Sequence, residues 1–237
     1  QGTAIVRVGG LTAAMTGANR ATLDGAGTEY FTVHTHANQH AAYFPGAQPV
    51  HVLMHVGVDG QILGAQAVGA EGVDRRIDVI ATAMRARLTA PDLMDLDLAY
   101  APPYGQAKDP VNQTGMVAHN VLSGQLALTG PNELTEDMPV LDVRTAAEYA
   151  QGHMPNSLNI PHTQLRDRLG EVQAWVDEET GDRPFVVMCA AGVRSWIAYR
   201  IARHAGFNVT MLSGGIQTLR AWLGERAEAV LAAEGDR

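Results

Sequence analysis

The chain has 237 residues, of which 46% are apolar and 18% are charged. This composition builds a packed core and excludes a disordered segment or a collagen-like fibre. Seventeen Lys and Arg stand against 25 Asp and Glu, which gives a formal net charge of −8. An acidic chain repels phosphate backbones, so we expect no nucleic-acid partner. No apolar run reaches the roughly 18 residues of a membrane helix, so we expect no membrane partner either.

The only cysteine excludes an internal disulfide and a thiolate-cluster metal site. A lone thiol in a chain without a signal peptide indicates a reducing, cytoplasmic location. The first residue is Gln1, followed at once by strand-like residues 4–8. We therefore expect the chain to begin inside a longer protein.

The first half mixes strands and helices. Three segments predict strands: residues 30–36, 51–58 and 61–68. Asp59-Gly60 joins the last two and supplies the positive φ angles of a tight antiparallel hairpin. From Val73 onward, apolar residues at spacings of 4, 3 and 4 predict a helix lying on a sheet, and a second helix is expected near residues 115–128. These elements predict an α+β domain over residues 1–130.

A second domain is expected over residues 136–237, after a stretch at 128–139 that is rich in Gly, Pro and Asn. Short apolar strands here alternate with helices. The strands are expected at residues 140–143, 158–160, 185–188 and 209–212, and the helices after Thr145, at 164–176, at 195–205 and from Ile216. This alternation is typical of an α/β domain whose parallel sheet is covered by helices on both faces.

Cys189 directly follows a predicted strand and opens the loop Cys-Ala-Ala-Gly-Val-Arg that leads into a helix. Ligands collect at the carboxyl ends of parallel strands. Backbone N–H groups at a helix N-terminus and the charge of Arg194 both favour a thiolate over a thiol. The small residues of the loop leave room for a curled backbone. The alternative is a buried structural cysteine, which the surrounding sequence disfavours.

The second domain resembles a rhodanese (sulfurtransferase) domain over about 100 residues. The resemblance rests on residues 141–144, 148–149 with 152–157, 160–161, 189–194 and 212–215. It implies that Cys189 is the nucleophile, which takes a sulfane sulfur and holds it as a persulfide. It also implies that the backbone of Ala190, Ala191, Gly192, Val193 and Arg194 cradles the outer sulfur, and that Arg194 favours anionic donors. The partners are then a donor (thiosulfate, a polysulfide or coenzyme A persulfide) and a thiol acceptor.

Loop length separates sulfur transfer from phosphate chemistry. Dual-specificity phosphatases of the wider fold use a loop one residue longer, which makes room for a tetrahedral phosphate. The six residues from Cys189 to Arg194 fit a single sulfur atom better. We expect Asp142 and Arg144 to support the loop and not to take part in the chemistry, and His153 to be structural.

The first domain resembles the dimerisation (interface) domain of the pyridine nucleotide-disulfide oxidoreductases, in the coenzyme A-disulfide reductase branch. The motifs are at residues 43–47, 62–69, 73–79, 98–104 and 107–112. The resemblance implies a homodimer and, for the full-length protein, FAD, NAD(P)H and coenzyme A. No glycine-rich dinucleotide loop is present in the sequence, so none of these cofactors is expected in this fragment.

Tyrosines of that family reach the redox site of the partner subunit. Tyr100 matches best and Tyr104 is the alternative, while aromatic packing at a dimer interface is an equally weighted explanation. The family often has two tyrosines where this chain has Tyr43-Phe44. His34 and His36 share a strand face, but no further ligand has a definite spacing, so no metal site is expected.

Two other functions remain open at this stage. The second is a non-catalytic dimerisation module that delivers persulfide to a flavin domain. The third possibility, a cysteine-dependent phosphatase, is less favoured because of the loop length.

Overall fold

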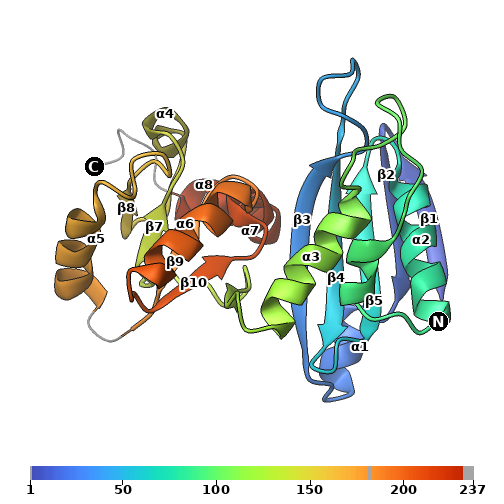
Figure 1. The fold of residues 1–237 in the computed structure, drawn as a ribbon, viewed down its shortest axis with the longest axis horizontal. Helices are drawn as coiled ribbons and strands as arrows, with labels where there is room; N and C mark the ends of the chain where they lie inside the picture. The colour runs from blue at the N-terminus through green and yellow to red at the C-terminus, as the bar shows by residue number, and fades with distance from the viewer. Residues whose placement is uncertain (1, 181–182, 232–237) are drawn as a thin grey trace. The chain divides into compact units, whose positions relative to one another are not determined.

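The computed structural model describes residues 2–180 and 183–231 (Figure 1). The chain divides into two compact units, Gln1–Gln125 and Leu126–Arg237. The division lies before the expected position at residue 130, because Leu128 and Thr129 form a short strand that pairs with a strand of the second unit. The segment thought to link two domains therefore belongs to the second one.

The first unit is an antiparallel sheet with helices, which confirms the predicted α+β class. Its strands follow the order β1-β2-β5-β4-β3, and each neighbouring pair is antiparallel. The elements are β1 (Thr3–Val8), β2 (Leu11–Gly17), α1 (Arg20–Gly25), β3 (Tyr30–Asn38), β4 (Pro49–Gly57), β5 (Ile62–Gly69), α2 (Val73–Arg85), the 3₁₀ helix η1 (Pro91–Asp95) and α3 (Pro110–Leu122).

The predicted hairpin is present as β4 and β5. Gly60 takes a positive φ of 86°, and the carboxylate of Asp59 accepts a hydrogen bond from the Gln61 N–H at 3.0 Å. Helix α2 contacts β2 and β5, whereas α3 contacts β3, β4 and α2. The apolar stripe predicted from Val73 is the buried face of α2, where Val73, Ile77 and Ile80 are buried.

Helix α3 begins earlier than the expected residue 115 and ends earlier than residue 128. Its start is fixed by Asp109, which caps the helix with Asn112 in a reciprocal capping box and precedes a proline at the first helical position. The Asp109 carboxylate also accepts a hydrogen bond at 2.7 Å from buried Arg76 of α2. Gly124, with a φ of 69°, follows the end of the helix.

The second unit is a parallel sheet with helices on both faces, as predicted. The strand order is β6-β10-β9-β7-β8, and all four neighbouring pairs are parallel. The elements are β6 (Leu128–Thr129), β7 (Val140–Asp142), α4 (Ala146–Ala150), β8 (Ser157–Asn159), α5 (Leu169–Trp175), the π-helix η2 (Val176–Thr180), β9 (Phe185–Met188), α6 (Val193–His204), β10 (Val209–Leu212), α7 (Gly215–Leu223), the 3₁₀ helix η3 (Gly224–Arg226) and α8 (Ala227–Val230).

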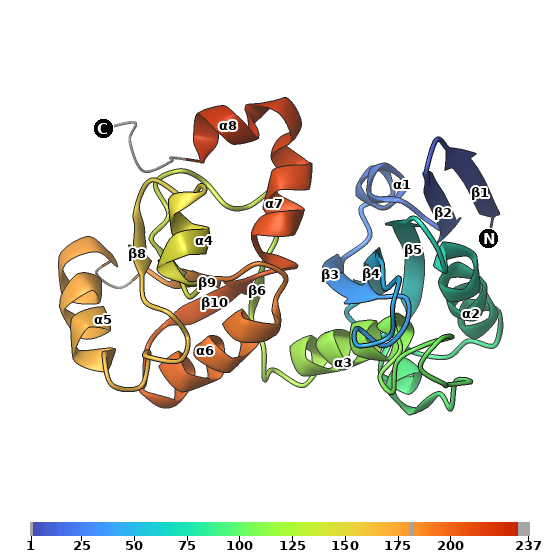
Figure 2. The same ribbon diagram turned by 90° about the horizontal axis from the view of Figure 1, so that it is seen from above.

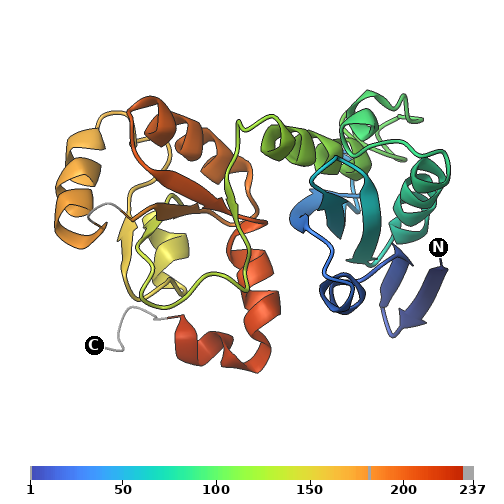
Figure 3. The same cartoon turned by 90° about the horizontal axis from the view of Figure 1, so that it is seen from below.

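Helix α6 covers one face of this sheet, and α4 and α7 cover the other (Figures 2 and 3). The central strand β9 is buried along its whole length. Its alternate residues Val186 and Met188 join a core cluster with Ile216 and Leu219 of α7. Full burial on both faces explains why this strand reads as a continuous apolar run.

Two helices of the second unit differ from their predicted limits. Helix α5 occupies only the later part of residues 164–176 and passes into the π-helix η2. Helix α6 starts at Val193, two residues before the expected 195, so its first turn contains the end of the cysteine loop. In the part of the chain that the structure describes, no helix is both long and apolar enough to cross a membrane.

Candidate active site

Cys189 lies at the carboxyl end of β9, the central strand of the parallel sheet. Helix α6 begins at Val193, so only Cys189 to Gly192 bridge the strand and the helix. Gly192 has a φ of 108°, a conformation that side-chain-bearing residues rarely adopt. The glycine is therefore required by the backbone turn that carries the chain from the cysteine into the helix.

The sulfur of Cys189 is buried and hydrogen-bonded. The residue is only 1% exposed. Its Sγ accepts a hydrogen bond from the Gly192 N–H at 3.2 Å and lies 3.4 Å from the Ser195 hydroxyl. So little exposure is typical of a structural cysteine, whereas an N–H donor aimed at the sulfur at the start of a helix stabilises negative charge there.

The loop is held from behind by the first turn of α7. The Ile216 N–H donates to the Cys189 carbonyl at 2.9 Å, and the Gln217 N–H donates to the Ala190 carbonyl at 3.1 Å. A Cβ on Gly215 would collide with the carbonyl oxygen of Cys189. The Gly214-Gly215 turn therefore brings α7 close enough for its first N–H groups to bind the carbonyl oxygens of the loop, while the loop itself leads into α6.

Arg194 is not a free positive charge. Its terminal nitrogens donate to both carboxylate oxygens of Glu148, at 2.6 and 2.7 Å. These hydrogen bonds lower the pKa of Glu148 to about 2 and raise that of Arg194, to which the nearby Cys189 also contributes. The expected charge beside the cysteine is present, but the Glu148 carboxylate balances it.

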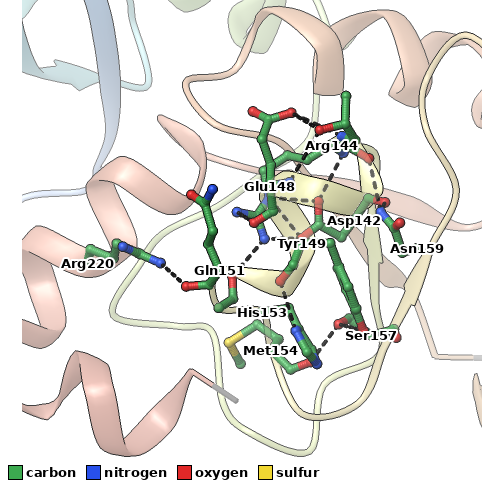
Figure 4. Close-up of polar contacts among 12 residues, drawn as sticks. Asp142, Arg144, Glu148, Tyr149, Gln151, His153, Met154, Ser157, Asn159 and Arg220 are labelled. Atoms are coloured by element: carbon green, nitrogen blue, oxygen red, sulfur yellow. Dashed lines mark hydrogen bonds and ion pairs between the residues drawn. The ribbon is translucent and has the colours of Figure 1, made fainter. Parts of the chain in front are cut away.

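Asp142 and Arg144 form a buried ion pair at the end of β7 (Figure 4). The closest oxygen–nitrogen distance is 2.6 Å, and the two side chains are 0% and 4% exposed. Arg144 also donates to the carbonyl oxygens of Glu148, within α4, and of Gly152, just after the helix. This geometry joins β7 to the helix that presents Glu148. Removing one partner of such a buried pair typically costs about 3–5 kcal/mol.

His153 has structural contacts. Its ring stacks on Tyr149 with centroids 3.8 Å apart, and its Nδ1 lies 3.0 Å from the Tyr149 carbonyl oxygen (Figure 4). The Tyr149 hydroxyl in turn donates to the Ser157 carbonyl at 2.9 Å. These contacts pin the turn after α4 against β8.

In the first unit, the structure brings Tyr100 next to Tyr43. Their hydroxyl oxygens are 3.5 Å apart, and this hydrogen bond raises the pKa of Tyr43. Both rings are exposed, Tyr43 by 76% and Tyr100 by 48%. Tyr104 is also exposed, but its backbone carbonyl is bound by Arg75 at 2.8 Å. The pair of tyrosine hydroxyls is thus formed with Tyr43, a residue whose role was left open by the sequence.

Four histidines of the first unit, His34, His36, His51 and His55, lie on β3 and β4. His36 and His51 are directly opposite each other, with their Nδ1 atoms 2.6 Å apart. His55 is buried, and its Nδ1 lies 2.8 Å from the Thr32 hydroxyl. Among the described residues, no group of three or more His, Cys, Asp or Glu side chains is arranged to hold a metal ion.

Two residues that contact the loop were not among the site residues expected from the sequence. Ser195 follows Arg194 directly, so it lies in the first turn of the helix that starts at the cysteine loop. This position is a local signal that could have indicated a contact with the cysteine. Glu148 enters the sequence analysis only as part of the motif at residues 148–149, and in the structure it caps α4 together with Thr145. Its contact with Arg194 spans 46 positions, and no local pattern reports such a distance.

Comparison with known protein families also divides the chain into two domains. The pyridine nucleotide-disulphide oxidoreductase dimerisation domain family matches residues 3–110, and the rhodanese-like domain family matches residues 130–221. Coenzyme A disulfide reductase of Staphylococcus aureus (strain bovine RF122 / ET3-1) is 44% identical over 91 residues, which are 38% of this chain and 21% of that protein.

Two solved structures span both units. Reduced Bacillus anthracis CoADR-RHD is 40% identical with a TM-score of 0.88, covering 94% of this chain and 40% of its own. The NAD-dependent persulfide reductase from A. fulgidus is 39% identical with a TM-score of 0.81, covering 91% of this chain and 39% of its own. This chain therefore spans well under half of each of these relatives. It consists of a pyridine nucleotide-disulphide oxidoreductase dimerisation domain followed by a rhodanese-like domain, and matches the C-terminal part of the coenzyme A-disulfide reductase and rhodanese fusions.

Proposed function

We propose that the second unit is a sulfurtransferase that carries sulfane sulfur as a persulfide on Cys189. The observation that carries this proposal is the sulfur itself, which accepts the Gly192 N–H at 3.2 Å where α6 begins. An amide donor and a helix N-terminus stabilise negative charge on sulfur. The membership in the rhodanese-like family supports the same chemistry.

The reaction has two displacement steps. The Cys189 thiolate attacks the outer sulfur of a donor; the new S–S bond forms as the bond from that sulfur to its carrier breaks, and the carrier leaves with the electron pair. A thiolate acceptor then attacks the outer sulfur of the persulfide and restores the Cys189 thiolate. The backbone from Ala190 to Arg194 provides the cradle, and thiosulfate, a polysulfide or coenzyme A persulfide is the donor.

Phosphatase activity is the weaker proposal because of Arg194. A Cys-dependent phosphatase needs the loop arginine to bind phosphoryl oxygens. Here both terminal nitrogens of Arg194 are engaged by Glu148 at 2.6 and 2.7 Å. A loop whose arginine charge is already balanced by a carboxylate suits a single sulfur better than a tetrahedral dianion.

Intact-protein mass spectrometry tests the sulfur carrier directly, because Cys189 is the only thiol. After incubation with a sulfane donor, the wild-type chain should gain about 32 Da on this covalent nucleophile. Cys189→Ala should gain nothing and should release no sulfide or sulfite. The control is Cys189→Ala combined with Ser123→Cys, which keeps one thiol at an exposed position. Equal sulfur uptake by this control would show that the loop confers no reactivity, and full turnover by Cys189→Ala would overturn the assignment.

For the longer protein, we propose a flavin-dependent reductase of coenzyme A disulfide or persulfide. The names of the relatives support these substrates and NAD, and the dimerisation domain supports a homodimer formed through the first unit. FAD, NAD(P)H and coenzyme A are then bound largely by domains outside this chain, in the cytoplasm. Tyr100 is proposed to face the redox site of the partner, with Tyr104 as the alternative. The hydrogen bond to exposed Tyr43 favours Tyr100.

The second candidate function is a dimerisation and persulfide-delivery module. In this role the chain positions two subunits, and its rhodanese-like half delivers persulfide to a flavin domain without turning over alone. Both functions need a persulfide on Cys189. They differ in the acceptor, because the sulfurtransferase passes the sulfur to a free thiol, whereas the delivery role passes it to the flavin domain.

A further inference from the structure

Glu148 neutralises the cation nearest the proposed nucleophile. Its carboxylate and the Arg194 guanidinium form a bidentate pair with the shortest distance at 2.6 Å, and the two side chains are 35% and 25% exposed. The pair therefore lies at the surface beside the loop, where an incoming donor meets it. In the sequence, Arg194 alone indicated a preference for anionic donors.

We propose that Glu148 is a specificity-determining residue that makes the loop select sulfane donors with little charge beside the transferred sulfur, such as organic persulfides, over the dianion thiosulfate. This inference rests on the proposed sulfur transfer through Cys189. Glu148 acts through Arg194 by balancing its charge and by accepting a hydrogen bond from each terminal nitrogen, so the guanidinium attracts a dianion less strongly.

The carboxylate is fixed in place, unlike an ordinary surface ion pair. The Thr145 N–H and hydroxyl donate to Glu148 Oε2 at 3.0 and 2.8 Å, and the Glu148 N–H donates back to the Thr145 hydroxyl at 3.3 Å. Arg144 holds the Glu148 carbonyl at 3.0 Å. The side chain thus cannot leave Arg194 without breaking the cap of α4, so a donor does not simply displace it.

The two donor classes place different charge beside this pair. Thiosulfate brings two negative charges, transfers its outer sulfur to the Cys189 thiolate and leaves as sulfite. A small alkyl persulfide brings at most one negative charge, transfers its outer sulfur in the same way and leaves as a thiolate. Two unit charges about 4 Å apart in a water-like dielectric attract each other enough to change a rate roughly fivefold. Each negative charge on the donor therefore changes its rate of reaction beside an unbalanced cation by about this factor.

The test measures the rate at which the full 237-residue chain gains one sulfur on Cys189, with thiosulfate and with an alkyl persulfide as separate donors. Glu148→Gln removes the charge and keeps a side chain that suits a capping box. The ratio of the thiosulfate rate to the persulfide rate should rise about fivefold in this variant. The matched control is Glu171→Gln, which breaks a similar bidentate pair with Arg168 on α5 and should leave the ratio unchanged.

Salt dependence gives a second reading in the wild-type chain. A balanced Arg194 predicts a thiosulfate rate that changes less than about twofold up to 0.5 M salt, and a steep fall only in Glu148→Gln. If Glu148→Gln does not fold, Glu148→Asp keeps the charge and should retain the wild-type ratio of the two donor rates. A thiosulfate rate that falls steeply with salt in the wild type would overturn the inference.

The outcomes separate this inference from the proposed function. An unchanged donor ratio in folded Glu148→Gln overturns the role of Glu148 and leaves sulfur transfer standing. A wild-type chain that gains no sulfur from either donor overturns both.

Discussion

Ser195 is the residue whose contacts with the nucleophile are most direct after Gly192. Its side chain is fully buried, donates to the Gly192 carbonyl at 2.9 Å and lies 3.4 Å from Cys189 Sγ. One hydroxyl hydrogen can serve only one acceptor at a time. A thiol can donate to the Ser195 oxygen, whereas a thiolate would draw the hydroxyl hydrogen toward the sulfur. Ser195 is therefore a positioning residue that responds to the charge on Cys189.

Ser195→Ala should slow alkylation of Cys189 by iodoacetamide at pH 7 by about tenfold, because a hydrogen bond to a charged group contributes roughly 1.5–3 kcal/mol. The rate is followed as the mass of the single adduct. Ser195→Thr keeps the hydroxyl and should restore most of the rate.

Ser157→Ala is the matched control, since it removes a bonded hydroxyl from β8 of the same unit. An alkylation rate in Ser195→Ala equal to that of the wild type would contradict the role of this hydroxyl.

At this scale the sequence predicts residues that act locally. Cys189, Gly192 and Arg194 are recognisable because strand, loop and helix follow one another along the chain. The Glu148–Arg194 pair and the Gly215 contact with the loop are not recognisable, because they depend on how β7, β9 and β10 are ordered in the sheet. Strand order sets which loops are neighbours, and apolar runs alone do not encode it.

Among the elements, β3 and β4 carry a pH-sensitive row of histidines. Burial, together with nearby positive charge on His36 and Arg20 for His34 and on Arg20 for His55, lowers the pKa of His34 to about 3 and that of His55 to about 4. The unfolded chain, with histidines near the ordinary value of about 6.5, binds more protons than the folded chain below that pH. The free energy of unfolding therefore decreases as the pH falls from 6.5 toward 4.

Replacing His55 by Phe should weaken this pH dependence. The variant removes one buried titrating group, so the stability lost between pH 6.5 and 4 should shrink by about 3 kcal/mol. Urea unfolding followed by far-ultraviolet circular dichroism at both pH values gives the measurement. Tryptophan fluorescence reports the second unit separately, because Trp175, Trp196 and Trp222 all lie there.

His204→Phe, at an exposed position of α6, controls for the loss of an imidazole in general. Identical pH dependence in His55→Phe and the wild type would contradict the explanation by burial of His55.

Element type was predictable where the apolar pattern is long, as in α2, β9 and the β4–β5 hairpin. The short helix α1 and the strand β2 were missed, and α5 was placed too early. Helix α1 has only six residues and one buried side chain, Leu23, so its period is too short to detect. Its cap at Asn19 accepts from the Thr22 N–H, a signal that is weak without an apolar stripe to follow.

For the whole molecule, the dimerisation domain leads to a prediction about assembly. Light scattering of the 237-residue chain should give twice the mass of one chain over a range of concentrations, because the first unit belongs to a family that dimerises. The mass should not change in Cys189→Ser, since the cysteine lies in the other unit. A single-chain mass at every concentration would contradict a self-sufficient interface and weaken the delivery role.

Both fold classes were predictable from composition and order of elements, but the limit between the units was not. Glycine and proline at 130–139 mark a turn-rich segment, yet two residues before it pair with β10. A two-residue strand has no periodicity of its own, so its partner is visible only in three dimensions.

The anchoring of the cysteine loop determines which positions around the site tolerate substitution. Ala190 is bound through its main-chain carbonyl oxygen by the Gln217 N–H, so a different side chain there leaves this contact intact. Gly215 and buried Arg144 have no such freedom, because one abuts the loop's carbonyl and the other secures the helix that faces Arg194. Tolerance to mutation is thus expected to be greater beside the nucleophile than at two positions outside its loop.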